Sequence, residues 1–330
     1  MLLLTRNDIK KVFSMEEAIE ADKKAFQIFS AGSSVTPLRT NISVPKYGGQ
    51  ALFMPGYVEA LDSAGLKIVS VFPGNSAKGK PSVPATMLLV DGTTGEVSAV
   101  LDGTYVTQLR TGAATGVATQ ILARKEARIG ALIGAGGQAA TQLEAMLTVR
   151  DLAEVRIFGA DREQAKAFIA AMTTELNHFK AQLRYTDSAS EAVDGADIIT
   201  TVTTSKHPVF DGRLVKQGAH INAIGSYMPI MQELDEHIVV RADKVYCESR
   251  EVALAEAGDF IVPLQKGLIT PEKITGEIGL LISGSVPGRE SEDEITLFKS
   301  VGVAVVDIVT AYDIYQKAMQ QGVGVQFDFN

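Results

Sequence analysis

Hydrophobic and polar positions follow two different rhythms along the chain, and the rhythm changes near residue 127. Before that point, residues 14–30 show the helical spacing of apolar positions, and Ser14 is the expected N-cap. Extended segments interrupted by proline follow, and residues 85–90 and 97–101 alternate like a hairpin around the turn Asp91-Gly-Thr-Thr-Gly-Glu96. This part of the chain predicts a mixed sheet with one or two helices.

Beyond residue 127, short apolar strands alternate with helices, which is typical of a doubly wound parallel sheet of the Rossmann type. The predicted strands are 129–133, 154–158, 182–185, 197–201, 221–224 and, as the last one, 245–248; the predicted helices are 138–149, 162–176 and 189–193. Residues 302–320 have a helical pattern and follow this sheet, so we expect them to return to the first domain. The sequence thus predicts an α/β protein in which a Rossmann domain, residues 113–302, is inserted into a smaller α+β domain formed by residues 1–112 and 303–330.

Composition and charge exclude several classes of protein. The 330 residues suffice for two domains, and the formal charge of −8 argues against a nucleic-acid partner, because phosphates need a basic surface. The one cysteine, Cys247, cannot form an internal disulfide, and its strand-like surroundings favour core packing over a reactive thiol. The first apolar stretch is too short for a signal peptide, and no run has the length of a membrane span. We therefore expect a cytoplasmic protein with no membrane partner.

A glycine-rich turn, Gly134-Ala-Gly-Gly-Gln-Ala139, follows the strand 129–133 and opens a helix. Gly134 makes the tight turn, and Gly136 lets a pyrophosphate approach the backbone. Gly137 and Gln138 complete the turn, and the N-terminus of the helix favours the phosphate charge. Strand, turn and helix together predict a binding site for NADH or NADPH.

The choice between these two cofactors stays open. Gly159 stands at the end of the second strand, where NAD-specific enzymes place an acid, and Asp161 and Arg162 follow it. Asp161 fits either a bond to the ribose hydroxyls or the N-cap of the next helix, whereas Arg162 fits a 2′-phosphate.

Three cations, Arg39, Lys67 and Arg110, lie in apolar or strand-like surroundings, where a solvated charge is unusual. A guanidinium binds a carboxylate through two parallel bonds, and a partly desolvated lysine can exchange protons near neutral pH. Taken singly, each is also consistent with an exposed charge on a strand or loop. The four histidines are dispersed, without the spacing of metal ligands or a Ser-His-Asp arrangement, so no metal site is predicted.

Six segments together resemble the ornithine cyclodeaminase/μ-crystallin family. They are Leu38-Arg-Thr40, Leu66-Lys-Ile68, Asp102-Gly-Thr-Tyr-Val-Thr-Gln-Leu-Arg-Thr-Gly-Ala-Ala114, Gly134-Ala-Gly-Gly-Gln-Ala139, Glu248-Ser-Arg-Glu-Val-Ala-Leu-Ala-Glu-Ala-Gly-Asp259 and Leu297-Phe-Lys-Ser-Val-Gly302. The resemblance implies a homodimer that forms through the first domain, with the active site between the two domains.

The resemblance also implies roles for single residues. Arg39, Lys67 and Arg110 would hold the substrate carboxylate, and Lys67 would also transfer a proton. The residues that would line the cofactor are Thr111, Gly136, Gln138, Val202 and Thr203.

One position departs from the cyclodeaminases of this family, which resemble Gly-Gly-Asp-x-Pro-Gly after the fifth strand and use that Asp as an acid and base. This chain has Gly225-Ser-Tyr-Met-Pro229, with Tyr227 at that position. Cyclodeamination needs a group that exchanges protons as ammonia leaves, and a phenol, with an ordinary pKa of about 10, is poorly suited. The Ser-Tyr-x-Pro version resembles relatives that reduce cyclic imino acids. The alternative is that another carboxylate, such as Glu233 or Asp235, replaces the Asp.

The function that these residues favour is NAD(P)H-dependent reduction of a small cyclic imino acid, Δ1-pyrroline-2-carboxylate or Δ1-piperideine-2-carboxylate, to proline or pipecolate. Hydride would pass to the imine carbon, which protonation at nitrogen makes electrophilic. The second hypothesis is an ornithine or lysine cyclodeaminase. Behind it stand an alanine dehydrogenase-type enzyme that acts on an amino acid and a non-catalytic protein that binds a dinucleotide or small ligand. Ring size and physiological direction stay open.

Overall fold

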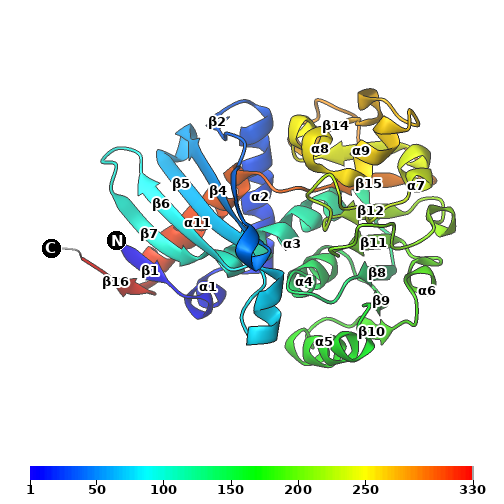
Figure 1. Ribbon diagram of the computed structural model, residues 1–330, viewed down its shortest axis with the longest axis horizontal. Coiled ribbons are helices and arrows are strands. Elements are labelled where there is room, and N and C mark those ends of the chain that lie inside the picture. The colour runs from blue at the N-terminus through cyan, green and yellow to red at the C-terminus, as the bar shows by residue number, and fades with distance from the viewer. Residues whose placement is uncertain (329–330) are drawn as a thin grey trace. The chain divides into compact units, whose positions relative to one another are not determined.

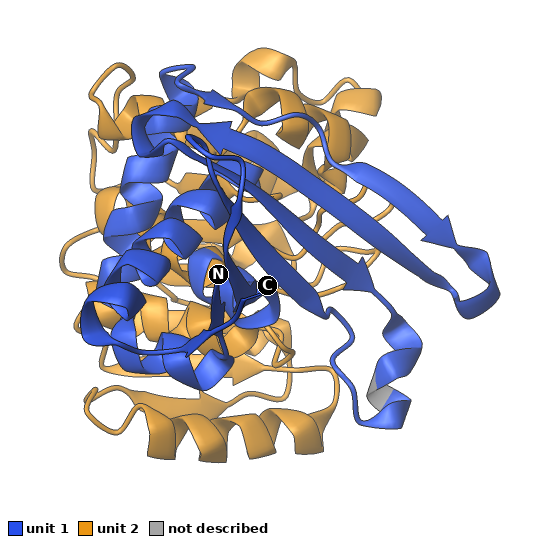
Figure 2. Ribbon diagram, turned by 90° about the vertical axis from the view of Figure 1, so that its left-hand side faces the viewer, with its two compact units in different colours: residues 1–110, 303–330 blue, residues 111–302 orange. Residues whose placement is uncertain are grey.

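The chain forms two compact units in the computed structural model, which describes residues 1–328, with Ser76 described by its backbone alone. Unit 1 consists of Met1–Arg110 together with the chain from Val303 onward, and unit 2 is Thr111–Gly302 (Figure 2). Both ends of the chain therefore belong to unit 1, and unit 2 is inserted between them. The predicted fold class, a parallel-sheet domain inserted into a mixed-sheet domain, is confirmed.

A mixed sheet forms the body of unit 1. Its strands are β1 (Leu2–Leu4), β2 (Ser34–Val35), β3 (Thr40–Val44), β4 (Gly49–Val58), β5 (Ser63–Val71), β6 (Ala85–Asp91), β7 (Val97–Asp102) and β16 (Val325–Gln326). They run in the order β16-β1-β7-β6-β5-β4-β2, and β3 also pairs with β4. Neighbours are antiparallel except β1 and β7. The predicted hairpin is the pair β6 and β7.

Helices α1 (Arg6–Val12), α2 (Met15–Ser30) and α11 (Ala304–Gln321) complete unit 1. Ser14 caps α2 as predicted, because its hydroxyl accepts a bond from the Glu17 backbone. The predicted C-terminal helix α11 packs against α2 and against β4, β5 and β6 (Figure 1). A glycine pair allows its close approach, because an added Cβ at Gly56 or Gly65 would lie 2.8 Å from the Ile308 side chain. These glycines are paired across β4 and β5.

All neighbouring strands of the sheet in unit 2 are parallel. The strands are β8 (Ile129–Ile133), β9 (Glu154–Phe158), β10 (Gln182–Tyr185), β11 (Ile198–Thr201), β12 (His220–Ala223), β13 (Lys244–Cys247), β14 (Gly276–Glu277) and β15 (Thr296–Lys299). Their order is β10-β9-β8-β11-β12-β15-β13-β14. The prediction that 245–248 is the last strand was wrong, because β15 enters the sheet between β12 and β13. β15 contains only two apolar residues, Leu297 and Phe298, which is too short a run to predict a strand on its own.

Helices flank this parallel sheet and bury its two apolar faces. They are α4 (Ala139–Val149), α5 (Arg162–Glu175), α6 (Ala189–Val193), α7 (Glu236–Arg241), α8 (Arg250–Glu256), α9 (Gly258–Gln265) and α10 (Ile278–Ile282). Short 3₁₀ helices punctuate both units at η1 (Pro45–Tyr47), η2 (Glu59–Leu61), η3 (Pro73–Lys78), η4 (Gly212–Leu214) and η5 (Pro271–Lys273).

Helix α3 (Gly103–Leu122) was not predicted, and it corrects the expectation that Arg110 lies in a strand-like setting. The helix is almost entirely buried from residue 105 onward, so its sequence has no polar face to reveal a helical period. It is also rich in glycine and β-branched residues, which disfavour a helix. Close packing explains one of them: a Cβ at Gly112 would lie 2.4 Å from the Thr141 carbonyl oxygen on α4.

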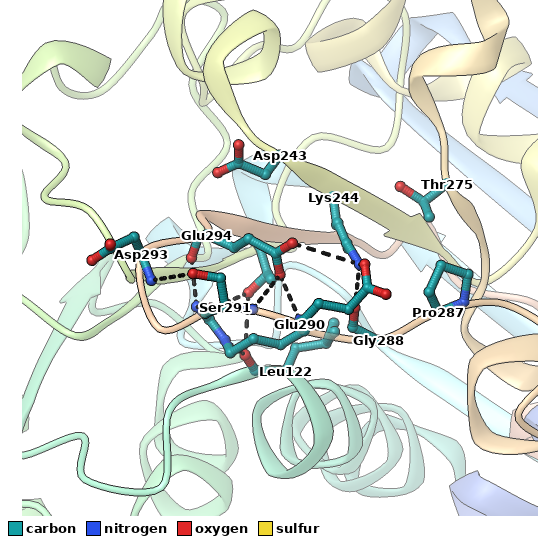
Figure 3. A network of polar contacts seen from close by, with 12 residues as sticks. Leu122, Asp243, Lys244, Thr275, Pro287, Gly288, Glu290, Ser291, Asp293 and Glu294 are labelled. Carbon is teal, nitrogen blue, oxygen red and sulfur yellow. Dashed lines mark hydrogen bonds and ion pairs between the residues drawn. The ribbon is translucent and has the colours of Figure 1, made fainter.

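Polar contacts hold the long connection that leads into β15 (Figure 3). The Lys244 ammonium on β13 donates to the Gly288 carbonyl at 2.6 Å and pairs with Glu290. Arg289 donates through Nε to the carbonyl of Leu122, at the end of α3, at 2.6 Å. The connection is thus held at two points before β15 pairs with its neighbours.

The buried thiol of Cys247 lies in β13 within the core of unit 2, as predicted, and burial raises its pKa well above the usual value. Within residues 1–328, no helix has the length and apolar character needed to cross a membrane.

Candidate active site

A buried cluster of opposite charges lies between the sheet of unit 1 and helix α11. Lys67 is in the middle of β5, paired with Met54 on β4 and Met87 on β6. Alternation along β5 turns Gly65, Lys67 and Val69 toward α11, so this lysine occupies a position where a hydrophobic side chain is expected. Its side chain is only 1% exposed.

Asp307 on α11 is the acid that compensates this charge. One carboxylate oxygen accepts from the Lys67 ammonium at 2.6 Å, and the other accepts from Arg110 Nε at 2.9 Å. Asp307 is 1% exposed and the Arg110 side chain 7% exposed. A buried charge is tolerated when it is paired and hydrogen-bonded, as each of these three is.

The pKa of Lys67 is lowered from 10.5 to about 7: burial is the largest cause, the charges of Arg110 and Arg39 act in the same direction, and Asp307 opposes them. Arg39 lies just before β3 and is half-buried. The structure thus brings two of the three predicted cations, Lys67 and Arg110, together on one carboxylate, and the charge of Arg39 acts on the same lysine.

The predicted dinucleotide turn connects β8 to α4 in unit 2. Gly134 has a φ of +115°, and an added Cβ would lie 2.6 Å from the Val202 carbonyl oxygen, so the fold itself requires glycine there. Gly136 differs, because a Cβ added to it would meet no atom of the described chain within 4 Å. The space in front of Gly136 is therefore available to a ligand.

The start of α4 has the features of an anion site. No side chain caps it, whereas Asp161 caps α5 and Ser188 caps α6. The side-chain carbonyl oxygen of Gln138 is buried and has no hydrogen-bond partner among the described residues; as an acceptor, it suits a hydroxyl donor of a ligand rather than the anion itself. Gly137 lies in the same turn, and Thr111 is a buried residue of α3 in the same unit.

Asp161 and Arg162 follow β9 as expected. The Asp161 carboxylate accepts from the backbone N–H of Gln164 at 3.0 Å, so it serves as the N-cap that the sequence allowed. The Arg162 side chain is 59% exposed, lies over the Tyr185 ring at 5.4 Å and faces Asp187 at 3.5 Å.

Two segments at the carboxyl ends of neighbouring strands carry the remaining predicted residues. Val202 and Thr203 follow β11, and Tyr227 follows β12; all three are half-buried. The backbone N–H of Val202 donates to Ile133, the last residue of β8, at 2.8 Å. These ends are where parallel α/β sheets bind ligands.

The buried side chain of Glu233 ties these two segments together. Its carboxylate accepts from four donors: the Thr201 hydroxyl at 3.0 Å and the backbone N–H groups of Thr203 at 2.5 Å, Gly225 at 2.6 Å and Ser226 at 3.2 Å. A carboxylate oriented toward four donors in the core is not presented to a substrate, which argues against Glu233 as a replacement for the cyclodeaminase acid.

Asp235, the other candidate replacement, is also engaged by backbone. It caps α7 by accepting from the backbone N–H of Ile238 at 2.9 Å, and it accepts from the backbone N–H of Gly212 at 2.8 Å.

Within residues 1–328, no group of three or more His, Cys, Asp or Glu side chains is arranged to hold a metal ion.

Asp307 is the site residue that the sequence analysis missed. The available signal was a single acid in the apolar run Val303-Ala-Val-Val-Asp-Ile-Val309. Lys67 was identified in the same way, as a single cation in an apolar strand. An acid on the buried face of an otherwise apolar helix indicates a buried partner.

Comparisons with known proteins agree over the whole chain. The sequence profile of the ornithine cyclodeaminase/mu-crystallin family matches residues 1–322. A Δ1-pyrroline-2-carboxylate reductase of Bacillus cereus is 43% identical over 329 residues, which cover 100% of both proteins. The structure of the Thermococcus litoralis Δ1-pyrroline-2-carboxylate reductase in complex with NADH and L-proline has a TM-score of 0.95 and 41% identity, covering 99% of this chain and 100% of that one. An archaeal alanine dehydrogenase dimer with bound NAD has a TM-score of 0.91 and 37% identity, covering 100% and 99%.

Proposed function

Because the chain belongs to the ornithine cyclodeaminase/mu-crystallin family, we propose that it reduces Δ1-pyrroline-2-carboxylate to proline with a reduced nicotinamide dinucleotide. The observation that carries the proposal is the charge balance in unit 1. Lys67, Arg110 and Arg39 supply three cations around a single buried acid, Asp307, so the cluster is suited to accept one more carboxylate. Relatives named for this reaction match over their full length.

Unit 2 fits a nicotinamide dinucleotide. Gly136 leaves open space where a pyrophosphate approaches the backbone, and α4 begins without a side-chain cap. The buried oxygen of Gln138, an acceptor without a partner within the described chain, would take a bond from a hydroxyl of the ligand. Gly134, Gly137 and Thr111 would contribute to the same site, with Val202 and Thr203 at the end of β11. When bound, the reduced dinucleotide supplies a hydride.

The chain's own residues would bind and protonate the substrate. Arg110 and Arg39 would hold its carboxylate through charge-assisted bonds, which fixes the position of the adjacent imine carbon. Lys67 would give a proton to the imine nitrogen, because an ammonium with a pKa of about 7 releases its proton readily near neutral pH. Hydride at carbon and a proton at nitrogen together convert the C=N bond to the CH–NH of proline.

The phenol of Tyr227 would not exchange protons as the cyclodeaminase acid does. Both nearby carboxylates considered as replacements, Glu233 and Asp235, are bound to backbone N–H groups. The chain therefore offers no evident acid at that position, and this favours imine reduction over ornithine cyclodeamination.

An assay with purified protein tests the proposal. Loss of NADH absorbance is followed with Δ1-pyrroline-2-carboxylate, with Δ1-piperideine-2-carboxylate, and with pyruvate plus ammonia; ornithine and alanine are tested with NAD⁺. We expect the five-membered imine to be reduced fastest and ornithine to release no measurable ammonia. Preferential turnover of alanine or of pyruvate plus ammonia would instead assign the alanine dehydrogenase activity of the related archaeal protein.

We also propose a homodimer formed through the sheet of unit 1. Helix α11 packs against one side of this sheet at β4, β5 and β6, and α1 and α2 pack against α11. The opposite side of the sheet is apolar and half-buried at alternate positions, which include Phe53, Leu66, Ile68, Leu88 and Val100. A second copy of the same face would cover it, and the archaeal relative is a dimer.

Light scattering after size exclusion tests the dimer. The mass should be about twice the 35.2 kDa of one chain. Ile68→Asp should give a monomer, because it places a charge in the middle of the face. Val240→Asp, at a residue of α7 that is already 45% exposed, is the control and should leave the mass unchanged. A dimeric Ile68→Asp protein would exclude this face as the interface.

A further inference from the structure

Asp307, in the C-terminal segment of unit 1, forms ion pairs with two residues of the N-terminal segment of that unit. It lies in the first turn of α11, only a few residues after the chain has returned from unit 2. Its carboxylate bridges Lys67 on β5 and Arg110 on α3, which come from two different elements. A carboxylate with one cation on each oxygen has a fixed orientation, and each cation is in turn held by it.

The fold positions this carboxylate accurately. Ile308, the next residue, packs against the sheet where the paired glycines Gly56 and Gly65 remove two side chains. Lys67 is two residues from Gly65 on the same face of β5. Ile308 therefore lies close to the sheet at this point, and its neighbour Asp307 reaches the lysine at 2.6 Å.

Charge explains why a carboxylate is needed at this point. The charged groups that act on the Lys67 ammonium are Arg110, Arg39 and Asp307, and only Asp307 is an acid. Without it, a buried lysine would face only like charges, which costs far more in the protein interior than in water. The cations would then move apart or lose a proton.

We propose that Asp307 is a positioning residue for the reduction: it holds the Lys67 ammonium and the Arg110 guanidinium on one carboxylate, so that the two act together on one substrate. This inference rests on the proposed function, because it assumes that Lys67 donates the proton and Arg110 binds the carboxylate. Arg110 contacts Asp307 through Nε, which leaves the end of the guanidinium geometrically suited to a substrate carboxylate.

The sign of the pH effect follows from these charges. Activity requires the protonated lysine, so kcat/KM should fall as the pH rises above the pKa of Lys67, which is about 7. Asp307 favours the charged form, and its removal should lower this pKa. The basic limb of the pH profile should therefore move to lower pH in a variant without the carboxylate.

The test compares Asp307→Asn with wild type in kcat/KM for Δ1-pyrroline-2-carboxylate across the pH range. We expect the basic limb to move down by about one to three pH units, with a loss of about 10- to 1000-fold at neutral pH. Asp313→Asn is the matched control on the same helix, because Asp313 has only a 3.9 Å contact with Lys24 and should leave the limb in place. Asp307→Glu, which keeps the charge but lengthens the side chain, should raise KM with little movement of the limb.

A measurement without substrate separates this inference from the proposed function. The folded pKa of Lys67 lies below its unfolded value of 10.5, so the free energy of unfolding should rise with pH from about 7 upward. In Asp307→Asn this rise should begin at lower pH, whether or not the imine is a substrate. If activity falls equally at every pH and the onset of the stability rise does not move, Asp307 is only a structural residue and the inference is wrong.

Discussion

The substitution Gly136→Val should weaken dinucleotide binding while leaving the stability of the fold unchanged. A Cβ at Gly136 meets no atom of the described chain within 4 Å, and the backbone there does not have the positive φ that disfavours other residues. A valine should therefore be accommodated by the folded protein. Its branched side chain would occupy the space through which a pyrophosphate must approach the backbone of the turn.

The expected loss of affinity follows from the bonds that this turn would make. A hydrogen bond to a charged group contributes about 1.5–3 kcal/mol, so losing two backbone N–H bonds to the pyrophosphate costs about 3–6 kcal/mol. The dissociation constant for NADH should therefore rise by about two to four powers of ten. The free energy of unfolding should change by no more than about 0.5 kcal/mol, as at other exposed sites.

Calorimetric titration with NADH and urea unfolding measure these two quantities on the same preparation. Gly74→Val is the matched control, since Gly74 also has open space around its missing Cβ and no positive φ but lies in unit 1. Gly134→Ala should show the opposite behaviour and lose stability, because that position has a φ of +115° and its Cβ would lie 2.6 Å from a carbonyl oxygen. Unchanged NADH affinity in folded Gly136→Val would remove this turn from the cofactor site and refute the reasoning.

Three further predictions concern the charged residues. Lys67→Met should lower kcat by about two to four powers of ten in the steady-state assay, because it removes the proton donor while filling a similar volume. Arg110→Ala and Arg39→Ala should mainly raise KM for the imine, since each removes a carboxylate contact, and a fall in kcat alone would contradict that role. Asp161→Ala should destabilise the protein by about 1 kcal/mol in urea unfolding through loss of the α5 cap, and should raise the efficiency with NADPH relative to NADH. An unchanged ratio of the two cofactors would show that Asp161 serves the helix alone.

The sequence was most informative where one local pattern determines both structure and chemistry. The strand, turn and helix around Gly134 and Gly136 form a contiguous unit, so their spacing alone specified the arrangement that the structure shows. The strands β8, β9 and β10 and the helix α6 lie at the residues where the alternation of strands and helices predicted them. Capping residues such as Ser14 were recognisable because a cap acts within four residues of itself.

The sequence was less informative where burial removes the pattern. Helix α3 is buried on nearly all sides from residue 105 onward, so hydrophobic periodicity could not distinguish it from a strand, and Arg110 was assigned to the wrong kind of element. Strand β15 is only four residues long, and its place between β12 and β13 depends on tertiary packing. The local sequence pattern contains no information about the helical state of α3 or about the position of β15 in the sheet.

The partnership of Lys67 and Asp307 illustrates the same limit for the site. The two residues are 240 positions apart, with the whole of unit 2 between them, so no spacing rule relates them. Each is conspicuous alone as a charge in an apolar run, but an unpaired buried charge only indicates that a partner exists, not which residue it is. The identity of the partner depends on the return of α11 to β4 and β5.

The packing of α11 on the sheet of unit 1 both covers apolar surface and brings an acid to the buried cations. Until α11 packs on the sheet, the inward side of β4, β5 and β6 is exposed, and Lys67 has cations near it but no acid. The apolar contact of Ile308 with Gly56 and Gly65 and the ion pair of Asp307 come from adjacent residues of one helix, so the packing of α11 on the sheet provides both. Burial of the apolar face therefore offsets the cost of desolvating the charges. The cation cluster can exist in the core only because the segment that neutralises it also completes that core.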